Sequence, residues 1–218
     1  HKAIVAPYRG TDARYVTNPY CATLPATDNN PPTVLDFATS MVAMGKIRVA
    51  RNKGEPAPEG ALMDSKGQPS RDPNIMYEEP LAGAPQPFGA HKGYGLALMN
   101  EILASAMTGG LGCRPETKYD PPKIINNMLS IIIDPMKLVS RQFFNSEVDA
   151  TIAHVKASPA ADPAKPVLVP GDPERASRDA RTSQGVPVDD ETWREITTAG
   201  ASVGLSSADL NKIAGLAA

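Results

Sequence analysis

The 218-residue sequence is poor in cysteine, has no long apolar run and carries almost no net charge. Its two cysteines, Cys21 and Cys113, lie far apart and outside any metal-ligand spacing, so we expect reduced thiols in a cytoplasmic protein and no metal site. No apolar stretch approaches the roughly 20 residues that a bilayer requires, and no signal peptide is visible at the start. The formal net charge of -2 gives no electrostatic reason to expect nucleic acid or a membrane surface as a partner.

The sequence also lacks a G-x-G-x-x-G motif between a strand and a helix, so it does not support a doubly wound dinucleotide fold. Hydrophobic residues make up 41% and charged residues 21% of the chain, as in globular proteins that bury a core. The 22 prolines occur in clusters, which argue against long helices or central strands at those places. Strands interleaved with helices and long loops therefore predict an α/β protein of the α+β kind.

Short apolar runs predict the strands. They mark a strand end at 2–6 and full strands at Tyr20–Leu24, Thr33–Phe37 and 127–133. The last of these, NMLSIII, has the strongest pattern in the chain. Residues 55–87 show no sustained hydrophobic periodicity, so we expect a long and mostly irregular excursion. Loops of this length usually cover a functional site or bind a ligand.

Two helices are predicted in the first half of the chain. The first is expected to follow the capping residues Thr39 and Ser40 and to end at Gly54. The second begins at the glycine-flanked pair His91-Lys92 and ends at 109–110. Its apolar face is formed by residues at helical spacing, namely Leu96, Met99, Ile102, Leu103 and Met107.

Three helices are predicted in the second half. A capping pair, Ser146 with Asp149, precedes one of them. A proline-rich connector covers 158–173. Two short helical patterns follow from Asp189 onward, and a second capping pair precedes the last of them, Ser206 with Asp209.

The start of the second helix is a candidate anion site. A helix N-terminus has unsatisfied N–H groups, and Gly93 and Gly95 would let an anion approach the backbone. Lys92 adds a point charge, and His91 can donate a hydrogen bond or a proton near neutral pH. The alternative is a tight glycine turn with both side chains solvated.

Asp36 is the second candidate, because a carboxylate within an apolar strand is costly unless it is paired. It could accept hydrogen bonds from a ribose hydroxyl, or it could cap the N–H groups of the adjacent turn. A similar choice concerns Lys46, Arg48 and Arg51, which could meet a 2′-phosphate or form a solvated helix face.

At four other positions a structural role is an alternative to a functional one. Thr17-Asn18-Pro19 is more typical of a turn than of a ligand contact. Tyr94 could stack on a base or a nicotinamide, although core packing is the commoner role. We expect His154 at the surface or satisfied in the core, and Trp193 as an anchor of the C-terminal helices.

Five segments, taken together, resemble the type 2 malate/L-lactate dehydrogenases. They occur in the order and spacing of that family: APYRGTDARYVTNP, TVLDFATSMVAMGKI, KGEPAPEGALMDSKGQPSRDP, PFGAHKGYGLALMNEILASAMTGG and LVPGDPE. The family also includes ureidoglycolate and sulfolactate dehydrogenases, diketogulonate reductase and reductases of cyclic imino carboxylates. The resemblance extends from about Ala3 to Trp193.

The resemblance implies an NAD- or NADP-dependent oxidoreductase that acts on small 2-hydroxy acids or their 2-oxo or imino counterparts. It implies a non-Rossmann, largely antiparallel sheet with flanking helices, in a homodimer. It also implies a cofactor site built from three segments. Its expected residues are Val34, Leu35, Asp36, Phe37, Ala38 and Thr39 in the first segment, His91, Lys92 and Gly93 in the second, and Gly171 and Asp172 in the third.

Two departures from the family pattern bear on activity. The acid/base histidine and the substrate-binding arginine are expected upstream of His1, so no catalytic residue is assigned within the chain. Arg9 and Val16 also stand where many members have glycine. On this basis residues 1–157 would form the cofactor-binding body. Residues 158–218 would be a connector and C-terminal helices that pack on an absent N-terminal domain.

Two rival hypotheses remain open at this point. The chain could be a non-catalytic nucleotide-binding or assembly fragment that keeps the fold without the acid/base group. Alternatively, His91 could be the acid/base of a different reaction at an anion pocket.

Overall fold

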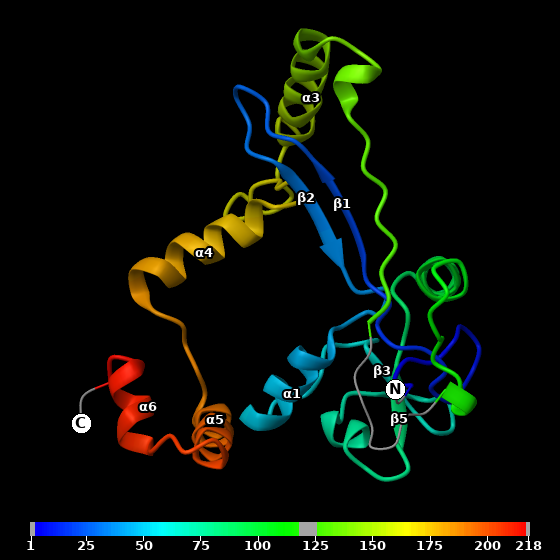
Figure 1. Ribbon diagram of the computed structural model, residues 1–218, viewed down its shortest axis with the longest axis vertical. Coiled ribbons are helices and arrows are strands. Elements are labelled where there is room, and N and C mark those ends of the chain that lie inside the picture. Colours follow the sequence, from blue (N-terminus) through cyan, green and yellow to red (C-terminus); the bar gives the residue numbers. More distant parts are fainter. Residues whose placement is uncertain (1–2, 118–125, 217–218) are drawn as a thin grey trace.

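The computed structural model describes residues 3–117 and 126–216, which form a packed centre and outer segments that extend from it (Figure 1). The centre contains β3, β5 and α1, while α3 lies at the top and α4, α5 and α6 extend to one side. Within the described ranges, no helix has both the length and the apolarity needed to cross a bilayer.

Two sheets are present, and every strand pair in the described residues is antiparallel. In the first, β1 (Tyr20–Leu24) pairs with β2 (Thr33–Phe37), with Tyr20 opposite Phe37. In the second, β3 (Leu62–Asp64) lies between β4 (Pro69–Ser70) and β5 (Gly83–Pro85). The predicted strands at Tyr20–Leu24 and Thr33–Phe37 are thus confirmed.

The main hydrophobic core lies between α1 (Met44–Lys53), β3 and a 3₁₀ turn, η1 (Pro73–Met76). Its buried members are Val42, Ile47, Ala57, Ala61, Leu62, Ile75 and Met76. Four of them come from residues 57–75, so the excursion predicted at 55–87, although mostly irregular as expected, supplies a large part of the core. Strands of two or three residues interrupted by proline are too short to produce a periodic pattern.

The first helix begins later than predicted. Its N-cap is Ala43, because Thr39 and Ser40 use their side chains elsewhere. Thr39 Oγ1 donates to the Thr17 carbonyl at 2.9 Å, and Ser40 Oγ donates to the Val42 carbonyl at 2.9 Å. Both residues therefore fix the turn between β2 and α1. The predicted end at Gly54 is confirmed.

The second helix, α2 (His91–Glu101), continues through a π-helical turn, Ile102–Ala106, and stops before the predicted glycines. Its buried positions are occupied by small residues, including Gly93, Ala97 and Ser105. The apolar face predicted to pack is largely exposed, since Met99 is 52% and Met107 69% accessible.

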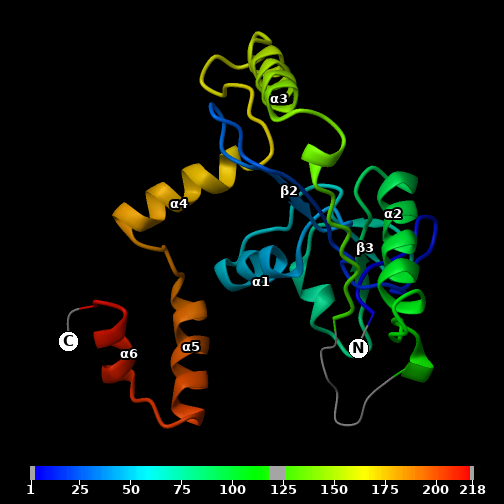
Figure 2. The same cartoon turned by 45° about the horizontal axis from the view of Figure 1, so that its top comes forward.

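Residues 127–133 do not form a strand, so that prediction was wrong. The segment runs from the centre towards α3 (Figures 1 and 2), and Ile132 is 94% exposed. A strand requires a hydrogen-bonding partner, and no described strand pairs with this segment. Apolar composition alone did not decide its conformation.

The third helix, α3 (Arg141–Lys156), is capped by Ser140, whose Oγ accepts the Phe143 N–H. The predicted capping pair at Ser146 lies inside the helix, and that prediction was wrong. Asp149 of α3 accepts hydrogen bonds from the β1–β2 turn, with Thr27, Asn29 and Asn30 as donors. These bonds lower the pKa of Asp149 and hold the hairpin tip against α3.

Three helices follow the proline-rich connector: α4 (Asp172–Gln184), α5 (Asp190–Ser202) and α6 (Ser207–Ile213). The last two were predicted, and the capping box of Ser206 with Asp209 is present. The sequence analysis missed α4 because it contains no large apolar residue and so gives no hydrophobic periodicity. Two further 3₁₀ turns are Pro115–Thr117 and Pro135–Lys137.

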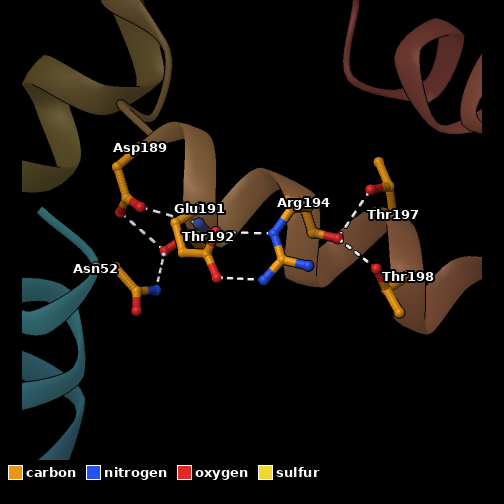
Figure 3. A network of polar contacts seen from close by, with 7 residues as sticks. All are labelled: Asn52, Asp189, Glu191, Thr192, Arg194, Thr197 and Thr198. Carbon is orange, nitrogen blue, oxygen red and sulfur yellow. Dashed lines mark hydrogen bonds and ion pairs between the residues drawn. The ribbon is translucent and has the colours of Figure 1, made fainter.

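A polar network joins α5 to the packed centre (Figure 3). Asp189 caps α5 by accepting the Thr192 N–H at 2.9 Å, and Thr192 Oγ1 accepts from Asn52 Nδ2 of α1 at 3.2 Å. The same helix carries an ion pair between Arg194 and Glu191. Trp193 is half-buried on it.

Candidate functional site

The strand β2 is the central part of the candidate site, and its first residues lie against Gly171. A Cβ placed on Gly171 would stand 3.4 Å from the Val34 backbone nitrogen and 2.7 Å from Arg175 Nη1. The φ of Gly171 is 97°, a value that residues with side chains rarely adopt. Arg175 also donates to the Pro32 carbonyl at 3.0 Å. The structure therefore brings the first and third predicted segments together.

Asp172 is held in place by several donors. Its carboxylate pairs with Lys156 at 2.8 Å and with Arg175, and it accepts the Val169 N–H at 3.1 Å. Hydrogen bonding from Lys156 and from the Val169 backbone, together with Arg175, lowers the pKa of Asp172 far below its ordinary value. Its side chain thus fixes the turn that presents Gly171.

The other end of β2 is tied to the start of α2. The rings of Phe37 and Phe88 meet edge to face with centroids 5.4 Å apart. Phe88 N–H donates to the Thr39 carbonyl at 3.0 Å, and Gly93 N–H donates to the Phe88 carbonyl at 2.9 Å. All three predicted segments are therefore connected through β2.

Gly93 is required for packing. A Cβ on this residue would overlap the Phe88 carbonyl oxygen and lie 2.8 Å from the Phe88 nitrogen. The expectation that this glycine lets an anion approach the backbone is wrong. The amides of Lys92, Gly93 and Tyr94 already donate to the carbonyls of Gly89, Phe88 and Ala90. A ligand at this helix start would meet the exposed side chains of His91 and Lys92 instead.

Asp36 is exposed on β2 opposite Cys21. It accepts none of the hydrogen bonds found among the described residues, so its interpretation as a structural cap is wrong. Neighbouring Val34 and Leu35 are 37% and 40% exposed, and β1 is exposed along its whole length. The carboxylate is therefore available to a ligand.

The remaining candidates have structural roles. Asn18 is buried and donates from Nδ2 to the Ala97 carbonyl at 3.0 Å and to Glu101 at 2.9 Å. Tyr94 packs on Tyr15, and burial together with a hydrogen bond between the two raises the pKa of Tyr15 to about 12.

Of the three α1 cations, Arg51 lies over the Tyr77 ring at 4.3 Å and donates to Asn74. Lys46 and Arg48 are exposed on the same helix. His154 is exposed on α3, as expected for a surface histidine. Within the described ranges, no cluster of His, Cys, Asp and Glu is arranged to hold a metal ion.

A cavity of about 520 Å³ beside the start of α2 was missed by the sequence analysis. It lies between segments that are far apart in sequence, and its polar and aromatic lining includes Tyr8, Arg9, Thr11, Lys66 and Gln86. The ring of Tyr8 is 6.2 Å from that of His91. The sequence feature that pointed to this place was Arg9, which stands where many members of the family have glycine.

Comparison with known proteins gives a consistent result. The model of a family described as malate/L-lactate dehydrogenase matches residues 1–197. Hydroxycarboxylate dehydrogenase B of Escherichia coli K12 is 44% identical over 203 residues, which are 93% of this chain and 55% of that protein. The malate/(S)-sulfolactate dehydrogenase of Methanothermus fervidus is 36% identical over 187 residues, covering 85% of this chain and 52% of that protein.

A solved E. coli structure assigned to the malate/lactate dehydrogenases superposes with a TM-score of 0.81 at 38% identity. The match covers 96% of this chain and 58% of that one. The chain thus spans about half the length of the relatives it matches.

Proposed function

This chain belongs to the malate/L-lactate dehydrogenase family, and from that premise we propose that it binds NAD or NADP for an oxidoreductase. The substrate class is a small 2-hydroxy acid or its 2-oxo or imino counterpart. The observation that carries the proposal is the connection of three distant segments along β2. Gly171 lies at one end, the start of α2 at the other, and an unpaired carboxylate between them.

The residues of these segments suit a dinucleotide. Asp36 is free to accept hydrogen bonds from sugar hydroxyls, and Lys92 supplies a positive charge for phosphate. The turn at Gly171 has no side chain, so Arg175 and the Val34 backbone pack closely against it and fix it beside the start of β2. When bound, the nicotinamide ring supplies the hydride donor or acceptor, while the chain binds and orients the dinucleotide.

We propose that this site is of a non-Rossmann kind. The support is that both sheets in the described residues are antiparallel and that β2 belongs to a two-stranded hairpin. A doubly wound site would instead lie at the carboxyl ends of parallel strands. Backbone and side-chain contacts along β2 would replace the glycine-rich turn.

We also propose a homodimer, as the family resemblance implies. A two-stranded hairpin is marginal alone in water, yet β1 and β2 expose both faces. The apolar residues of 128–133 are exposed as well, including Ile131 at 79% and Ile133 at 67%. A partner subunit covering these surfaces would account for their composition, and light scattering coupled to gel filtration measures the assembly.

Proton transfer is proposed to come from a group outside the 218 residues. Neither His91 nor His154 has a carboxylate partner in the described structure, and both are exposed. Oxidation of a hydroxyl requires a positioned base. We therefore expect the isolated chain to bind dinucleotide weakly and not to reduce a 2-oxo acid such as pyruvate. Steady NADH oxidation by the purified chain would contradict this and favour His91 as an acid/base.

Saturation-transfer NMR tests the binding proposal, because it detects weak complexes. NADH or NADPH at about 1 mM should receive saturation from the wild-type chain, consistent with a dissociation constant near that value. Asp36→Asn and Lys92→Gln should each reduce the transfer. Glu59→Gln, an exposed change away from β2, is the matched control. The proposal fails if the wild type gives no transfer, or if all three variants behave alike.

A further inference from the structure

The cavity beside the start of α2 is built by two turns that touch. One is the turn at 7–11, closed by a hydrogen bond from Gly10 N–H to the Pro7 carbonyl at 2.9 Å. The other joins β3 to β4, where Gly67 N–H donates to the Asp64 carbonyl at 3.0 Å. A Cβ on Gly67 would lie 3.1 Å from Thr11 Cγ2, so the turns are in contact. The volume of about 520 Å³ is in the range of small-molecule sites.

The charge of this cavity is of one sign. Each turn contributes one cation, Arg9 from the first and Lys66 from the second, and no Asp or Glu lines it within the described residues. Neither cationic side chain has a hydrogen-bond or ion-pair partner in the described part of the chain. By contrast, Arg14, five residues after Arg9, pairs with Asp12 at 2.6 Å. Two unpaired cations facing one cavity create a positive potential that attracts anions.

The backbone at Arg9 supports a ligand-binding role. Its φ is 70°, in the left-handed region where glycine is preferred, and Ala90 across the cavity has φ 55°. Such conformations cluster at functional sites, where the surrounding structure maintains them. The guanidinium of Arg9 lies 5.3 Å from the centroid of the Tyr8 ring, which limits its orientations.

We propose that this cavity binds an anionic group, either phosphate, carboxylate or sulfonate, through Arg9 and Lys66. Two sources would supply it, a phosphate of the dinucleotide or the second acid group of a dicarboxylic or sulfonated substrate. The choice of source rests on the proposed function, whereas anion binding itself does not. Tyr8, in contact range of His91, links the cavity to the candidate cofactor site.

Amide-resolved NMR titrations of the 218-residue chain with inorganic phosphate test the anion site. Loss of one charge-assisted contact should weaken phosphate binding about tenfold in Arg9→Gly and in Lys66→Gln. Glycine fits φ 70°, so Arg9→Gly should fold at least as well as the wild type. Arg14→Gln removes a nearby paired charge and should bind phosphate as the wild type does.

Two further arms distinguish the sources. If the cavity holds a cofactor phosphate, Arg9→Gly should weaken adenosine 2′,5′-bisphosphate more than it weakens malate. If it holds a substrate acid group, the same change should weaken malate while leaving lactate unaffected. Equal phosphate affinities in wild type, Arg9→Gly and Lys66→Gln would overturn the assignment. That result would leave dinucleotide binding along β2 intact, since Asp36 and Lys92 are tested separately.

Discussion

The packed centre and the outer segments of this chain differ in what covers their apolar residues. In the centre, Ile47 and Leu62 have no accessible surface, and short strands and a 3₁₀ turn enclose them. In the outer part, Met128 is 79% and Ile132 94% exposed, although their segment is the most apolar in the chain. Both regions contain large apolar residues, and the described fold buries those of the centre.

The candidate cofactor segments lie where these two regions meet. The end of β2 is anchored in the centre through Thr39, which is 1% exposed. Its start is anchored to the outer part through Gly171 and the ion pairs of Asp172. The middle of the strand, with Asp36, is exposed. A rigid anchor at each end and an open middle suit a strand that presents a ligand surface.

The largest expected effect separates the two regions directly. Leu62→Ala deletes a buried side chain and should lower the free energy of unfolding by about 2–5 kcal/mol. In the monomeric chain, Ile132→Ala should change it by less than about 0.5 kcal/mol, because the side chain is 94% exposed there. Urea unfolding of the isolated chain measures both. Comparable losses in the two variants would mean that the outer segment is packed in solution.

A smaller effect is expected where the centre meets the ligand surface. Gly93→Ala places a Cβ against the Phe88 backbone, and should cost about 1–3 kcal/mol through overpacking. It should also weaken dinucleotide binding, since it displaces the start of α2. Gly95→Ala meets nothing within 4 Å and should be neutral or stabilise the helix by up to about 1 kcal/mol. A loss with Gly95→Ala as large as with Gly93→Ala would contradict this packing.

The smallest effect is expected at Asp172, whose ion pairs hold the turn at Gly171 against the start of β2. Asp172→Asn should lower the free energy of unfolding by roughly 0.5–1 kcal/mol at pH 7, because its cationic partners are partly exposed. The pKa of Asp172 is lowered in the folded state, so its contribution is present above the unfolded pKa of about 4. It is lost as the pH falls from about 4 towards the folded pKa.

Urea unfolding of wild type and Asp172→Asn at pH 7 and pH 3 measures how much of the free energy of unfolding depends on the Asp172 carboxylate. Wild type should lose more stability than Asp172→Asn over that interval. Asp162→Asn, which removes an exposed pair with Lys165, is the control and should resemble the wild type. A variant that follows the wild-type curve at both pH values would show that the Asp172 pairs contribute nothing.

Part of the fold was readable from local signals. The strands at 20–24 and 33–37, the helix stop at Gly54 and the capping box at Ser206 follow from a few neighbouring residues. The failures have different causes. The 127–133 run has no strand partner among the described residues, the strands of 62–85 are too short to show a periodic pattern, and α4 has no large apolar residue.

The candidate site shows the same division. The residue types and their order were sufficient to select His91, Lys92 and Asp36 and to establish the family resemblance. Only tertiary structure joined Gly171 to Val34, gave Gly93 a packing role and placed Arg9 and Lys66 in the lining of one cavity. The sequence determines which side chains are available, whereas the distances between side chains that are far apart in sequence are set by the fold. What this sequence determined by itself was therefore the set of available groups and its local helices and strands, and the tertiary structure decided which groups can act together.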